Sequence, residues 1–257
     1  MEIVQSLLVL IILIALGVAG RHLRIIKKND TRVLTSFVYY FSLPALFVVK
    51  ISQIDLFQLK AWLVIGSYAP ILLISLLLLI AFLLDFIRKD NFILLSLSVV
   101  FGSNAFFGLA FFEYFQKGNY FDYAVVSASL LGALGIILSL MLFEFSQDRI
   151  SFKRIWKDLL KNPLLIAIAL GLVMSLIGFR NSFLHEALDF LGLAAPTIAI
   201  FSLGNFLYDH FSFKTINKSL LLALFRFITL PAALMVTFLL LQYQGDFDLE
   251  QFLLLQT

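Results

Sequence analysis

Polar residues that interrupt a long apolar stretch are the first candidates for chemistry in this chain. The octapeptide FGSNAFFG, residues 101–108, contains Gly102, Ser103, Asn104 and Gly108. Serine and asparagine compete for local backbone hydrogen bonds, and glycine costs about 1 kcal/mol relative to alanine in a helix. An unwound segment here exposes a half-helix N-terminus, whose partial positive charge attracts an anion. The alternative is a continuous helix that uses these residues for close packing.

Four further side chains within apolar stretches are candidate binding residues. Arg226 pairs with an anionic substrate or a neighbouring carboxylate, or else its guanidinium snorkels to the lipid headgroups. Asp189 is a candidate proton-coupling carboxylate, the alternative being an interfacial residue near a helix end. Ser42 and Ser127 are candidates for facing a polar cavity, although serine in membrane helices more often bonds its own backbone or packs between helices.

Other kinds of site lack the residues that they need. The chain has no cysteine, so a disulfide, a thiolate metal site and a cysteine nucleophile are excluded. His185 and Glu186 are adjacent, but no second histidine follows at helical spacing, so no metal site is expected. A Gly-rich phosphate loop, a paired-acid motif and a serine nucleophile elbow are all missing from the sequence. We therefore expect neither an enzyme nor a bound cofactor.

The composition indicates that these candidates lie within a membrane. Hydrophobic residues make up 61% of the 257 and charged residues 14%, with a mean hydropathy of +1.01. A soluble domain carries roughly 25% charged residues, so this chain lacks the side chains for a polar surface.

Eight apolar segments are long enough to be considered as spanning helices, since about 20 residues cross a bilayer core. None alternates strictly between polar and apolar residues, which argues against a barrel. The expected spans are Ile3–Gly20, Val33–Val49, Ala61–Leu84, Phe92–Phe112, Tyr123–Phe145, Leu164–Phe179, Ala187–Leu207 and Leu220–Leu241.

The basic residues predict an orientation. The odd-numbered connections between spans hold 14 of the 19 Lys and Arg residues, and the even-numbered ones hold 4. Cationic loops stay in the cytoplasm, so the N-terminus is expected outside, and the short loops favour a bacterial inner membrane. The linker 146–162 alternates basic and apolar residues, as expected for a helix lying on an anionic inner leaflet. Binding of nucleic acid or a protein is the alternative, but no aromatic platform accompanies the charge, so no nucleic-acid partner is expected.

The two halves of the chain carry matching prolines. Pro44 and Pro196 are 152 residues apart, and Pro70 and Pro231 are 161 apart. Proline bends a helix, so matched prolines suggest matched bends, although they also arise by chance. Five spans in each half would make the halves inverted repeats, a transporter architecture with its site near the membrane midplane. We expect a first repeat at 1–145 and an incomplete second repeat at 163–257, truncated after eight spans.

At these motifs the sequence resembles the auxin efflux carrier family of permeases, which includes plant PIN proteins and bacterial members. The resemblance covers nearly the whole chain and rests on the segments YFSLPALF at 40–47, FGSNAFFGL at 101–109, KNPL at 161–164, AAP at 194–196 and SLG at 202–204. Ser103 stands where the family usually has Asn, and Ala110 where it commonly has Pro.

The resemblance implies an all-α, NhaA-like bundle of five plus five inverted helices in which helices four and nine cross at the substrate site. It also implies a scaffold of helices one, two, six and seven beside a moving group, and organic anions as substrates. We therefore predict a secondary transporter of carboxylates or auxin-like acids that works by alternating access. The partners expected are the lipid bilayer, the anion, and protons or the membrane potential, with a homodimer left open. The alternative is a non-transporting fragment or degenerate homologue with a structural or oligomeric role.

Overall fold

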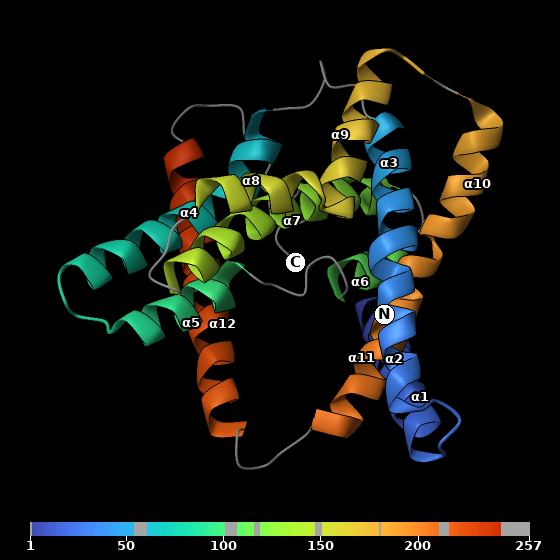
Figure 1. Cartoon of the computed structure of the whole chain (residues 1–257), viewed down its shortest axis with the longest axis horizontal. Helices are drawn as coiled ribbons and strands as arrows, with labels where there is room; N and C mark the ends of the chain where they lie inside the picture. Colours follow the sequence, from blue (N-terminus) through green and yellow to red (C-terminus); the bar gives the residue numbers. More distant parts are fainter. Residues whose placement is uncertain are drawn as a thin grey trace. The chain divides into compact units, whose positions relative to one another are not determined.

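The computed structural model describes residues 2–53, 61–100, 107–115, 119–146, 151–179, 181–210 and 216–242. Within these ranges all regular structure is helical (Figure 1). The elements are, in chain order, α1 (Glu2–His22), α2 (Lys28–Phe37), the π-helix η1 (Val38–Ser42), α3 (Leu43–Gln53), α4 (Ala61–Leu83), α5 (Lys89–Val100), α6 (Phe107–Phe115), α7 (Asn119–Ser146), α8 (Phe152–Leu160), α9 (Pro163–Leu176), α10 (Ser182–Gly192), α11 (Ala194–His210) and α12 (Ile216–Gln242).

Five described stretches are long and apolar enough to cross a membrane, which confirms the predicted all-α membrane class. They coincide with the first, second, fifth, seventh and eighth expected spans, and are Val4–His22, Lys28–Gln53, Ala124–Ser146, Ser182–His210 and Leu220–Thr237. The third expected span is helical over Ala61–Leu83.

The sixth expected span is a shorter helix than the sequence suggested. α9 has 14 residues and follows α8 at a bend of 63°. Asn162 Oδ1 accepts hydrogen bonds from the amides of Leu164 and Leu165 and so caps α9. Pro163 has no amide hydrogen and suits the first position of a helix, but it cannot continue the preceding one. The bend therefore follows from the Asn-Pro pair.

The expected fourth span is described in two parts, on either side of residues 101–106. α5 ends at Val100 and α6 begins at Phe107, and residues 101–106 lie outside the described residues. The predicted interruption at Ser103 therefore stays a prediction.

The chain divides into two compact units. Unit 1 comprises Met1–Leu59, Ser103–Ser129 and Lys161–Phe211, and unit 2 comprises the remaining ranges. In unit 2, α4 and α5 form a hairpin (Figure 1) that packs against α12 around a core containing Ile71, Phe92 and Val99. Each unit draws on both halves of the sequence, so the predicted repeats at 1–145 and 163–257 do not coincide with the units and stay a prediction.

Two long helix pairs hold unit 1 together. α1 packs along α11, and α9 packs along α3, as can be followed in Figure 1. A Cβ added at Gly17 would overlap the carbonyl oxygen of Phe201, and one at Gly204 would overlap that of Ile14. A Cβ at Gly171 would lie 2.9 Å from Ile51 Cβ. Glycine is therefore what lets these helices approach so closely.

Two of the matched prolines follow an irregularity in a helix. η1 ends at Ser42, and the amide of the next residue, Leu43, donates to the carbonyl of Val38, five residues back. Pro44 follows Leu43. Pro196 lies in the first turn of α11, after α10 has ended at Gly192. A proline cannot bond to the carbonyl four residues before it, so both positions favour an interrupted helix.

Candidate functional site

The residues of the predicted crossover are only partly described. Gly102, Ser103 and Asn104 lie outside the described residues. Gly108 is the second residue of α6 and is buried in unit 1.

The two candidate serines are buried in unit 1. Ser42 is the last residue of η1 and is 0% exposed, and its Oγ makes no hydrogen bond within the described part of the chain. Ser127 is buried in α7. Ser129, two residues later, donates to the Val126 carbonyl at 2.7 Å, the backbone bonding that is common for serine in membrane helices.

Asp189 lies in α10 and forms an ion pair with α3. Its Oδ1 is 3.4 Å from Lys50 Nζ. Nearby, His185 Nε2 is 2.9 Å from Ser52 Oγ. The end of α3 and the middle of α10 are therefore joined by one ion pair and one hydrogen bond. Lys50 and Asp189 are 139 residues apart along the chain. Sequence reasoning missed Lys50 because nothing local connects it to Asp189.

Arg226 lies in α12, within unit 2, and reaches the end of another helix. Its Nη1 donates to the Ser98 carbonyl at 3.2 Å, and Ser98 belongs to the last turn of α5. The last carbonyls of a helix carry partial negative charge and attract a cation. This contact favours a guanidinium held by the protein over one that only snorkels to lipid headgroups. It places a positive charge beside the helix that leads into residues 101–106.

Glu144 and the linker are also connected within unit 2. Arg154 Nε lies 3.6 Å from Glu144 Oε1, and the Ser151 amide donates to Glu144 Oε2 at 3.2 Å. Ile155 of α8 is buried, whereas Arg154 and Lys157 on the same helix are exposed. α8 therefore places a buried apolar residue between exposed basic ones, and the predicted membrane-surface role of 146–162 stays a prediction.

Comparison with known proteins shows which family the second part of this chain is similar to. Residues 148–256 match a family described as membrane transport protein. This part of the chain, 109 of the 257 residues, is similar to that family. The match confirms the predicted resemblance to auxin efflux carrier permeases and supports a role in membrane transport. It also fits the expectation that this transporter is not an enzyme. No curated protein matches the chain.

Proposed function

We propose that this transporter is a secondary carrier of small organic anions, such as carboxylates or auxin-like acids, that works by alternating access. The observation that carries the anion preference is Arg226, a cation within an apolar helix that is anchored at the end of α5. A guanidinium has five N–H donors in a fixed fork, a geometry that suits the two oxygens of a carboxylate. Gly102, Ser103, Asn104, Gly108, Ser42 and Ser127 stay predicted substrate-binding residues.

The packing of unit 1 supports an inverted repeat. If α9 is the counterpart of α1, and α10–α11 the counterpart of α2–α3, then contact between α1 and α11 requires contact between α9 and α3. Both contacts occur. Gly17 packs on Phe201 and Gly204, and Gly171 packs on Val48 and Ile51.

The spacing of these contacts is nearly constant. Gly17 and Gly171 are 154 residues apart. The residues that they contact are 153 apart in both cases, since Phe201 corresponds to Val48 and Gly204 to Ile51. The prolines that follow the two helix interruptions are 152 residues apart. The glycine contacts and the prolines after the helix interruptions therefore repeat at nearly the same sequence separation. Duplication of an ancestral segment produces such a pattern.

Transport of labelled carboxylates by proteoliposomes tests the proposal. The chain as it exists is reconstituted, and counterflow is compared for the wild type, Arg226→Gln, Arg226→Lys and a Lys157→Gln control on α8. Hydrogen bonds to charged groups contribute about 1.5–3 kcal/mol, so Arg226→Gln is expected to lower uptake by about tenfold or more. Arg226→Lys should retain part of it because the charge remains, and Lys157→Gln should match the wild type.

Uptake of no organic anion by the wild type would overturn the proposal and favour a non-transporting role. Equal uptake by Arg226→Gln and the wild type would be consistent with transport but would show that Arg226 does not bind the anion. Gel filtration of each variant shows whether a loss of uptake reflects a loss of folding.

A further inference from the structure

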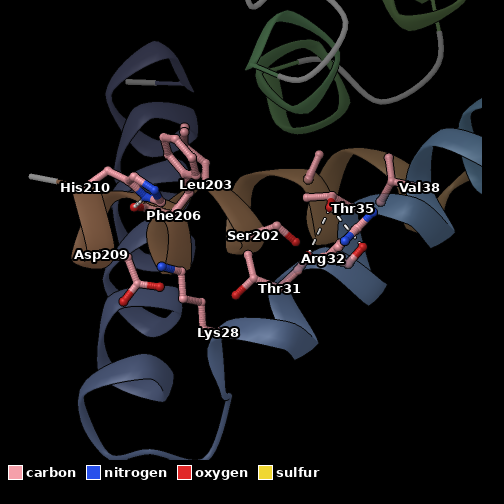
Figure 2. A pocket seen from close by; sticks show the side chains of 11 residues that line it. Lys28, Thr31, Arg32, Thr35, Val38, Ser202, Leu203, Phe206, Asp209 and His210 are labelled. Atoms are coloured by element: carbon pink, nitrogen blue, oxygen red, sulfur yellow. Dashed lines mark hydrogen bonds between the residues drawn. The ribbon is translucent and has the colours of Figure 1, made fainter.

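A cavity of about 390 Å³ lies within unit 1, between α2 and α11. Its walls come from one face of each helix, since the lining residues on α2 begin at Lys28 and recur at Thr31 and Arg32, three and four positions on. Figure 2 shows the side chains of Lys28 and Thr31 extending from α2 toward α11, and that of Ser202 extending from α11 toward α2. The remaining lining is largely apolar.

The charge around this cavity is mainly positive. Lys28 and Arg32 have no carboxylate within 4 Å in the part of the chain that the structure describes. Asp209 also lines the cavity, but both of its oxygens lie 3.0 Å from Arg21 Nε, and Oδ1 lies 2.9 Å from Arg21 Nη2. Arg21 pairs with this carboxylate and Lys28 also acts on it, so three cations, Arg21, Lys28 and Arg32, stand against one carboxylate and the net charge at the cavity is positive.

Two hydroxyl groups in the cavity are buried and without a partner. Ser202 is 2% exposed, and its Oγ makes no hydrogen bond to any described residue. Thr31 Oγ1 faces the cavity from α2 and likewise has no partner among the described residues. A buried hydroxyl without a partner is costly, so each of these two groups needs an explanation, and a bound ligand that accepts its hydrogen supplies one. Ser202 lies eight residues before His210, the last residue of α11, and is therefore about 12 Å along the helix axis from that end.

We propose that this cavity binds a phosphate group carried on a small organic body. Lys28 and Arg32 would neutralise the phosphate, and the hydroxyls of Thr31 and Ser202 would donate to its oxygens. Two cations and two hydroxyls suit a tetrahedral group with several acceptor oxygens better than they suit a carboxylate. Apolar residues such as Leu203 and Phe206 would cover the organic part. Nothing in this inference depends on transport, since Arg226 belongs to unit 2.

A phosphate of this kind has two sources. One is the headgroup of an anionic phospholipid, entering from the bilayer that surrounds α2 and α11. The other is a soluble phosphate monoester.

Binding of phosphatidylglycerol and phosphatidylcholine to the whole purified chain is measured by native mass spectrometry, and binding of glycerol phosphate in detergent by titration calorimetry. The choline cation opposes Lys28 and Arg32, so phosphatidylcholine is the matched lipid control.

Two pocket variants and one charge-matched variant are compared. Thr31→Val with Ser202→Ala removes the two hydroxyls with little change in volume. Lys28→Gln with Arg32→Gln removes two charges, and Lys153→Gln with Lys157→Gln removes two charges from α8 in unit 2 as the control. We expect the first two variants to bind about tenfold or more weakly, and the control to bind as the wild type does.

The outcomes separate the two sources. Tight binding of phosphatidylglycerol that both pocket variants lose supports the headgroup, and binding of glycerol phosphate with the same losses supports the soluble ligand. The proposal is overturned if neither probe binds, if the α8 control loses as much as the charge variant, or if the hydroxyl variant binds with wild-type affinity.

Discussion

At the scale of single residues, the pairing of Asp189 with Lys50 gives a predicted coupling carboxylate a defined surrounding. The pair lies 3.4 Å apart and is partly exposed, with 13% of the Lys50 side chain and 35% of the Asp189 side chain accessible. Exposed pairs contribute about 0–1 kcal/mol to stability and buried pairs cost more to break, so Lys50→Gln is needed as the control for the structural share of this pair. With that control, an effect of Asp189 on proton coupling can be distinguished from an effect on folding.

Neutralising Asp189 separates these roles. Asp189→Asn is expected to abolish uptake driven by a pH gradient while leaving counterflow close to wild type, because counterflow needs no net proton movement. Lys50→Gln removes the same ion pair but keeps the carboxylate, so it should retain gradient-driven uptake. If both variants lose only stability, by less than about 1 kcal/mol, then Asp189 is structural. Uptake and thermal unfolding of both variants provide the measurement.

Residue chemistry was only partly readable from the sequence. Asn162 and Pro163 are adjacent, so the start of α9 follows from local rules for caps and prolines. The contact of Arg226 with Ser98 joins residues 128 positions apart and depends on how α12 packs on α5. The spacing of Lys28, Thr31 and Arg32 is a helical stripe that could have been recognised, but its partner face on α11 could not.

At the scale of elements, glycine contacts set how close the paired helices of unit 1 come. The backbone of α1 touches that of α11 at Gly17, and α9 meets α3 at Gly171. Gly132 in α7 has no atom within 4 Å of the position that a Cβ would occupy. The three glycines therefore differ in how much room a side chain would have.

Substitution by alanine should reveal this difference. Gly17→Ala and Gly171→Ala are each expected to destabilise the protein by about 1–3 kcal/mol, because the added methyl group forces the helices apart. Gly132→Ala should be neutral or stabilising, since alanine is the better helix former by about 1 kcal/mol. Thermal unfolding in detergent, monitored by gel filtration, distinguishes the three. Equal behaviour of Gly17→Ala and Gly132→Ala would contradict the close contact of α1 with α11.

Element boundaries were predicted well wherever hydrophobicity decides them. The expected span Tyr123–Phe145 lies within α7, and Leu220–Leu241 lies within α12. Irregular backbone was harder to place. Pro44 and Pro196 were predicted to bend their helices, yet the π-helix η1 before Pro44 has no simple signature in the sequence.

At the scale of the whole molecule, the orientation in the bilayer is a prediction that rests on the distribution of Lys and Arg. The absence of cysteine makes it directly testable, because any introduced thiol is unique. Glu2→Cys and Ser182→Cys should react with a membrane-impermeant maleimide in intact cells. Asp158→Cys on α8 should react only after the cells are opened, since the linker is expected in the cytoplasm. The reverse pattern of labelling would invert the topology, and the wild type serves as the unlabelled control.

The division into two units was not predictable from the order of segments. Hydropathy gives the spans one by one, but unit 1 collects helices from the beginning, middle and later part of the chain. The resemblance implies that helices one, two, six and seven form a group. Unit 1 contains α1, α2, α3, α9, α10 and α11, but also α6 and the start of α7, so this grouping stays a prediction.

The contact between Gly17 and Gly204 has a consequence for biosynthesis. These residues are separated by 187 positions, and a ribosome adds about 5–20 residues per second. The glycine surface of α1 is therefore exposed to lipid or to insertion factors for roughly 10–40 s before α11 is translated. Conditions that slow elongation between these two helices lengthen that interval, so the yield of inserted protein should depend on translation speed.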